Sequence, residues 1–129
     1  MSNSAGEILT RNSSMDAEHR VQVRLIEVLC KAVDDGKPND EVTDLLQQLI
    51  DYSKAHFMSE ELLMRLDSYE GFDEHVEDHA QMLETLDALA HGQASGATRL
   101  MAGQVKDLLA FLLRHIETRD ARYANSVKI

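Results

Sequence analysis

The chain has 129 residues, of which 43% are hydrophobic and 28% charged, a balance typical of one folded domain and not of a disordered chain. Acidic residues outnumber Lys and Arg by 23 to 13, and the net charge of −10 argues against binding to nucleic acid or to an anionic membrane. The single cysteine cannot form an internal disulfide, and no signal peptide or membrane-spanning segment is evident, so we expect a soluble, cytoplasmic protein.

One proline, six glycines and few aromatic residues favour long helices over strands. Residues 1–15 are polar and predict a flexible leader. Asp16 is the predicted N-cap of a first helix that ends near Gly36. Asn39 is the predicted N-cap of a second helix, which breaks between Ser68 and Gly71. Its inward stripe is predicted to be Val42, Leu46, Leu49, Ser53, His56, Glu60 and Leu63.

A third helix is predicted from Asp73 to Gly92, and a fourth from about residues 96–98 towards the C-terminus. Four long helices joined by short loops predict an all-α, up-down-up-down four-helix bundle over residues 16–129. The predicted inward residues are His75, His79, Met82, Leu86 and Leu89 on the third helix, and Met101, Val105, Leu108, Leu112 and His115 on the fourth.

Every predicted helix carries a histidine where a core leucine is expected. A single histidine on an apolar face is usually a satisfied core residue, so one of them alone indicates little. Glu60 is harder to explain, because a buried carboxylate is costly unless it is paired or bound to metal. One metal centre would satisfy this carboxylate together with five histidines, namely His19, His56, His75, His79 and His115.

The spacing of these residues supports a metal centre. His56 and Glu60 are four residues apart, as are His75 and His79, so each pair lies about 40° apart around its helix. Asp120 is five residues after His115, which on an ideal helix separates the two side chains by about 140°. We therefore predict a local widening towards π-helical geometry between residues 113 and 120, a distortion that tends to occur at functional sites.

These residues, in this order, resemble the hemerythrin family, and its bacterial members in particular. The resemblance covers nearly the whole chain from Asp16 to about Tyr123. Phe111 departs from the pattern, since relatives commonly carry tryptophan there. The matching motifs are D-A-E-H at 16–19, H-F-M-S-E-E at 56–61, H-V-E-D-H at 75–79 and H-I-E-T-R-D at 115–120.

The resemblance implies a site with two non-haem iron ions. Glu60 and Asp120 would bridge the irons, together with an oxo or hydroxo group from solvent. The remaining ligands would divide as His75, His79 and His115 on one iron, and His19 and His56 on the other. Glu61 and Glu77 are next to or between ligands in the sequence, but we expect them to point away into solvent.

The ligand count leaves one position open, on the iron held by only two histidines. An open position on a reduced metal can bind a small ligand, and an all-nitrogen-and-oxygen site suits iron or manganese better than a tetrahedral structural zinc. The family resemblance implies that this ligand is O₂, bound reversibly for storage, transport or delivery, in a binding protein and not an enzyme. Leu112 and Ile116 share the face of His115 and are predicted to line the O₂ pocket.

Two alternatives remain open from the sequence. The first is an O₂- or redox-sensing domain of a signalling protein, since bacterial relatives occur fused to signalling modules. The second is a diiron oxidase or ferroxidase of the ferritin-like kind. That class uses Glu-x-x-His pairs and about four glutamates, and here no Glu stands three residues before a histidine. The sequence leaves the protein partner unknown.

Overall fold

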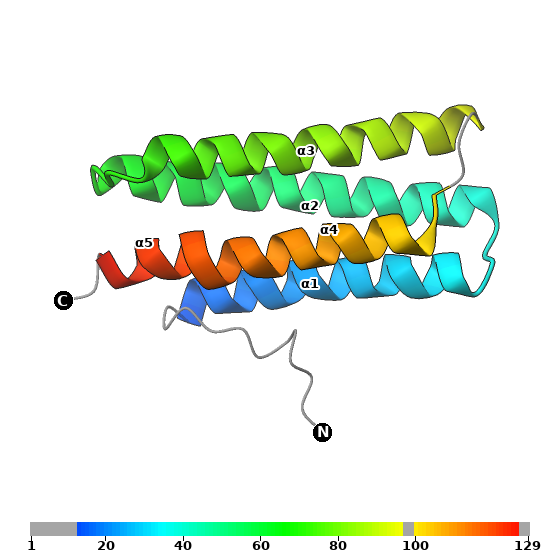
Figure 1. The fold of residues 1–129 in the computed structure, drawn as a ribbon, viewed down its shortest axis with the longest axis horizontal. Coiled ribbons are helices and arrows are strands. Elements are labelled where there is room, and N and C mark those ends of the chain that lie inside the picture. Colours follow the sequence, from blue (N-terminus) through cyan, green and yellow to red (C-terminus); the bar gives the residue numbers. More distant parts are fainter. Residues whose placement is uncertain (1–12, 97–99, 127–129) are drawn as a thin grey trace, which may run out of the picture.

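The computed structural model describes residues 13–96 and 100–126, and in these ranges every regular element is helical. The helices lie side by side along one long axis (Figure 1). α4, the π-helical turn η2 and α5 follow one another without a break and form the fourth rod. The elements are α1 (Ser13–Asp34), α2 (Asn39–Leu66), α3 (Phe72–Ser95), α4 (Ala102–His115), η2 (Ile116–Asp120) and α5 (Ala121–Ser126).

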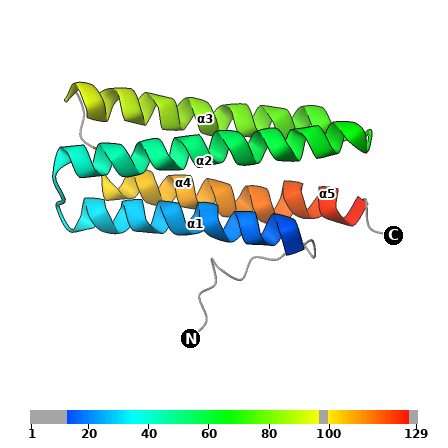
Figure 2. The same ribbon diagram turned by 180° about the vertical axis from the view of Figure 1, so that it is seen from behind.

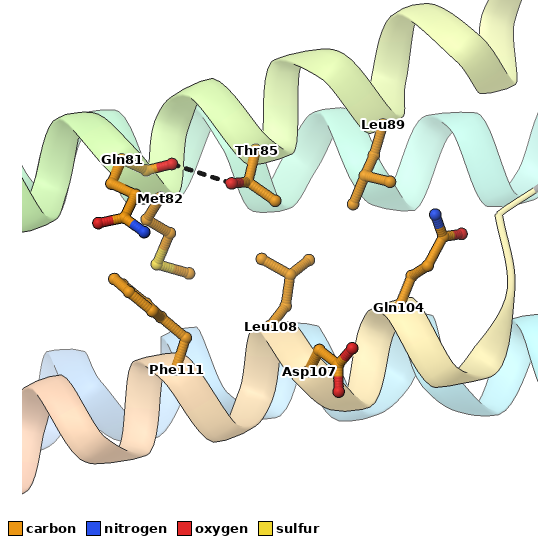
Figure 3. Close-up of a pocket in the computed structure, with 8 residues that line it drawn as sticks. All are labelled: Gln81, Met82, Thr85, Leu89, Gln104, Asp107, Leu108 and Phe111. Carbon is orange, nitrogen blue, oxygen red and sulfur yellow. Dashed lines mark hydrogen bonds between the residues drawn. The ribbon is translucent and has the colours of Figure 1, made fainter.

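The arrangement confirms the predicted four-helix bundle. Successive rods run in opposite directions, with α1 packed on α2 and α4, and α2 packed on α3 (Figures 1 and 2). α3 and α4 face each other across a surface groove of about 270 Å³, into which Met82, Leu108 and Phe111 point (Figure 3). None of the helices within the described ranges combines the length and apolarity needed to cross a membrane.

The first helix begins earlier than predicted. α1 is already helical at Ser13, so Asp16 is not its N-cap but a buried residue inside the first turns. Met15, which we had placed in the leader, packs with Met64 and Tyr123 in a small apolar cluster. Burial of this apolar side chain stabilises the N-terminal turn of α1, so the helix begins before Asp16. Residues 1–12 of the predicted leader lie outside the described ranges.

A pair of side chains links the start of α2 to the last turn of α3. Asn39 is the first residue of α2 and not its cap, and its amide hydrogen-bonds across the bundle to Gln93 of α3. Gln93 lies beyond Gly92, where we had predicted the end of α3, and the helix continues through both residues. The helix stops instead at Ser95, because Gly96 adopts a left-handed conformation with φ of 76°.

The fourth rod starts later than predicted. α4 begins at Ala102, and the predicted start at 96–98 falls partly in residues 97–99, which lie outside the described ranges. Met101 precedes the helix, where its N–H donates to Oε1 of Gln104 at 2.9 Å. This capping position explains why Met101 is exposed and not part of the inward stripe.

The other predicted stripes form the core, with one exception on α2. Leu63 is 46% exposed, whereas Met64 is fully buried in its place. Position 64 lies four residues after Glu60 and so continues the buried face, while position 63 turns towards solvent. The largest buried cluster includes Ile26, Leu46, Leu49, Leu86, Val105 and Leu112, and it fills the bundle on one side of the predicted site.

Candidate metal centre

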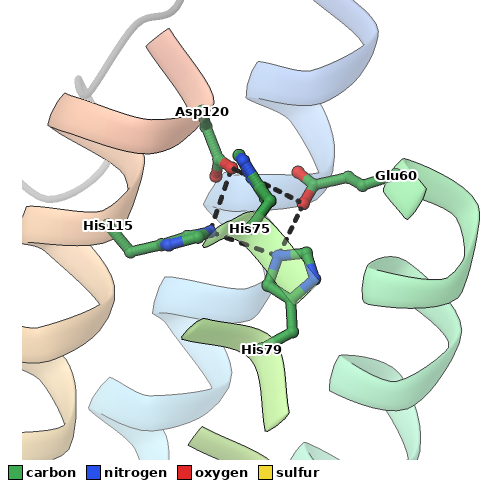
Figure 4. Close-up of side chains that lie close together, drawn as sticks. All are labelled: Glu60, His75, His79, His115 and Asp120. Carbon is green, nitrogen blue, oxygen red and sulfur yellow. Dashed lines mark hydrogen bonds and ion pairs between the residues drawn. The ribbon is translucent and has the colours of Figure 1, made fainter. Parts of the chain in front are cut away.

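The seven predicted site residues come together inside one end of the bundle. Every rod contributes at least one of them, and all seven side chains are buried. They form two groups of donor atoms that share Glu60, and in each group the donor atoms lie within 4.8 Å of one another. The larger group is Glu60, His75, His79, His115 and Asp120 (Figure 4), and the smaller is His19, His56 and Glu60.

The larger group gathers three imidazoles around two carboxylates. Nε2 of His75 lies 2.5 Å from Oδ1 of Asp120, and Nε2 of His115 lies 3.0 Å from the same oxygen. Nε2 of His79 lies 3.1 Å from Oε1 of Glu60. These side chains point towards one another from α2, α3, α4 and η2 (Figure 4).

The smaller group uses the opposite oxygens of the same carboxylates. Nε2 of His19 and Nε2 of His56 each lie 3.1 Å from Oε2 of Glu60. Nε2 of His19 also lies 2.8 Å from Oδ2 of Asp120. Glu60 and Asp120 therefore each direct one oxygen to the three-imidazole group and the other oxygen to the two-imidazole group.

A π-helical turn brings Asp120 into this position. Within η2 the chain makes a wide turn, in which the N–H of Ala121 bonds to the carbonyl of Ile116, five residues earlier. The extra residue rotates Asp120 back to the face of His115, from which an ideal helix would separate it by about 140°. The predicted distortion between residues 113 and 120 is confirmed.

Three of the imidazoles contact carboxylates of neighbouring helices through the ring nitrogen that faces away from the centre. In each pair the ring Nδ1 faces a carboxylate oxygen, and the carboxylate accepts a proton that this nitrogen carries. The pairs are His56 with Glu18 at 2.5 Å, His79 with Glu61 at 2.7 Å, and His115 with Asp78 at 3.1 Å. Such contacts orient the rings and keep Nε2 free to bind a metal.

We did not predict these three carboxylates from the sequence, and the prediction for Glu61 was wrong. Its side chain is only 29% exposed and faces His79, whereas Glu77 is exposed as expected. The sequence did contain a signal, because each carboxylate stands directly beside a predicted ligand within a motif. Glu18 precedes His19, Glu61 follows Glu60, and Asp78 precedes His79.

The nitrogen atoms that face the centre need a cation. Nε2 of His79 and Nε2 of His115 are 3.2 Å apart, and with the protons on Nδ1 both would present lone pairs to each other. Among the residues that the structure describes, Nε2 of His56 and Oε1 of Glu60 are also buried without a hydrogen-bond partner. Lone pairs that converge in this way are stabilised by a positive ion between them, so the donor set fits a bound metal.

Electrostatics keep both central carboxylates ionised. Burial by itself lowers the pKa of His19, but hydrogen bonds to Asp120 and Glu60 outweigh it and raise the pKa to about 9. Burial and mutual repulsion raise the pKa of Glu60, yet its imidazole neighbours hold that pKa below its usual range. The pKa of Asp120 is likewise held low by His115, His19 and His75, against the effect of burial.

Apolar side chains surround the imidazoles. Leu112 and Ile116, the predicted pocket residues, are fully buried. Phe57 stacks on the ring of His79, with centroids 3.9 Å apart, a contact that we did not predict. Phe111 is half-buried and lines the groove between α3 and α4. The site therefore combines a polar centre with buried apolar neighbours.

A four-helix bundle with a buried cluster of nitrogen and oxygen donors from every rod defines a class of helical metal-binding proteins. A family model described as the hemerythrin HHE cation binding domain matches residues 10–125. This match covers nearly the whole chain, and the chain belongs to the hemerythrin family.

Curated relatives support the same assignment. The chain is 27% identical over 115 residues to a bacteriohemerythrin of Pseudomonas paraeruginosa, a match that covers 88% of this chain and 73% of the relative. It is 29% identical over 115 residues to a hemerythrin of Phascolopsis gouldii, with 89% and 83% covered. A myohemerythrin of Theromyzon tessulatum is 26% identical over 109 residues, with 84% and 79% covered. No solved structure gives a significant match.

Proposed function

We propose that this domain holds two iron ions and binds O₂ reversibly, for storage, transport or delivery to enzymes that require oxygen. The position of the two carboxylates carries the proposal. Glu60 and Asp120 each have one oxygen near the three-imidazole group and the other oxygen near the two-imidazole group. One iron would be held by His75, His79 and His115, and the other by His19 and His56.

The metal would supply an open position and electrons for O₂. The residues of this chain would balance its charge and orient its imidazole ligands. The low pKa values of Glu60 and Asp120 keep both carboxylates ionised, so they would offset the charge of bound cations. Glu18, Glu61 and Asp78 hold the proton on Nδ1 of their imidazoles and so direct Nε2 to the metal. This set of five neutral imidazoles and two carboxylates carries less negative charge than a ferritin-like site, which favours binding over oxidation.

Leu112 and Ile116 are proposed to line the O₂ pocket. Both are fully buried, and Leu112 is one turn before His115 on the same helix face. Hydrocarbon at these positions keeps water and protons away from a bound ligand, which favours its release as O₂.

Anaerobic loading with ferrous iron, followed by metal analysis and absorption spectroscopy, tests the proposal. We expect about two irons per chain, and a charge-transfer spectrum that appears in air and disappears on deoxygenation. A matched control is His91→Ala, because His91 is exposed and its ring contacts the carbonyl of Asp87 in its own helix, away from the predicted ligands. A protein that takes up no iron, or that consumes O₂ continuously with excess ferrous iron, would contradict reversible binding.

A further inference from the structure

A buried polar pair adjoins the two-imidazole group. Gln22 of α1 and Ser53 of α2 are both completely buried, and Nε2 of Gln22 donates to Oγ of Ser53 at 2.9 Å. Gln22 is three residues after His19, and Ser53 is three residues before His56. Because the two helices are antiparallel, both residues lie about 4.5 Å further into the bundle than the imidazoles.

The pair is confined to one side of the centre. The corresponding positions on the other two rods, one turn inward from His79 and His115, are Met82 and Leu112, which are buried and apolar. The next turn inward from the pair is also apolar, since Ile26 and Leu49 are fully buried there. The amide of Gln22 is therefore placed where the two-imidazole group meets the hydrocarbon core.

One end of this amide has no partner in the described part of the chain. Oε1 of Gln22 is buried without a hydrogen bond, and so is Nδ1 of His19, so the two atoms do not bond to each other. An unpaired buried carbonyl lowers stability. The other buried glutamine shows the contrast, because Gln93 accepts from the N–H of Leu100 at 2.8 Å and donates to Asn39.

We propose that Gln22, oriented by Ser53, is a hydrogen-bonding contact for the small polar ligand that binds on the two-imidazole side. The inference rests on the proposed function. The hydroxyl of Ser53 accepts from Nε2 or, with the amide turned over, donates to Oε1. The free end of Gln22 is accordingly an acceptor for a protonated ligand or a donor for an anionic one.

Azide titration of the iron-loaded, oxidised protein tests this role, with Gln22→Leu compared with Gln93→Leu. In Gln22→Leu we expect unchanged iron content and an azide affinity lowered roughly threefold to tenfold, the effect of one hydrogen bond. In the metal-free form, Gln22→Leu removes the unpaired carbonyl but also the bond to Ser53, so its unfolding temperature should change less than that of Gln93→Leu. Gln93→Leu should bind azide normally and unfold at a lower temperature.

Each outcome separates the inference from its alternatives. A Gln22→Leu protein with wild-type azide affinity would overturn the ligand contact, and one with reduced iron content would assign the amide to support of His19 instead. Ser53→Ala provides a second, smaller change, and it should weaken azide binding in the same direction. A wild-type protein that loads no iron would overturn the proposed function as well, whereas normal loading with equal azide affinities would overturn only the inference.

Discussion

The contact between Glu61 and His79 yields a sharp prediction about metal affinity. Oε2 of Glu61 accepts from Nδ1 of His79 at 2.7 Å, and the carboxylate is only 29% exposed, so solvent screens it weakly. Removal of a partner behind a metal-binding histidine typically costs roughly tenfold to hundredfold in affinity, or about 1.4–2.8 kcal/mol. We expect Glu61→Leu to fall in this range and Glu61→Gln to lose less, because the amide oxygen can still accept the hydrogen bond.

The assay is an anaerobic competition for ferrous iron between the protein and a coloured chelator. Glu77→Leu is the matched control, because Glu77 is an exposed carboxylate close to the ligands of α3 and should leave affinity unchanged. Equal iron affinity for Glu61→Leu and wild type would show that this carboxylate does not act through His79, and it would refute our account of how the rings are oriented.

The remaining predictions concern the ligands and the adjoining end of the bundle. His75→Ala should lose iron and unfold at a lower temperature, because metal binding is linked to folding; retention of both irons would contradict the ligand assignment. Chelation of iron from the wild-type protein should lower its unfolding temperature, as measured by circular dichroism, and re-addition should restore it. Burial and the bond to Asp67 raise the pKa of Tyr123 above 10, so its contribution to the free energy of unfolding is present below pH 10 and declines above it. In denaturant titrations Tyr123→Phe should be less stable at neutral pH and should show a weaker decline above pH 10.

Local spacing accounts for what could be predicted from the sequence. Hydrophobic periodicity predicted four helices, and the four-residue separation of His75 and His79 placed both on one face. The five-residue separation of His115 and Asp120 predicted the π-helical turn, because no ideal helix could bring both to one site. These features depend only on the geometry of a single helix.

The helix ends depended on contacts that local signals do not contain. Asp16 and Gly92 have the chemistry of a cap and a stop, yet the burial of Met15 and the bond between Asn39 and Gln93 continue the helices through both. Tertiary packing outweighs capping preferences because a buried side chain contributes more free energy than one cap.

Side-chain pairings between rods were decided by the tertiary structure alone. Glu61 faces His79, and Gln22 faces Ser53, only because antiparallel helices pack in one particular register. A shift of one residue along either helix would turn these side chains away by about 100°. The sequence determined which residues line each helix, and the packing of the helices determined which of them meet.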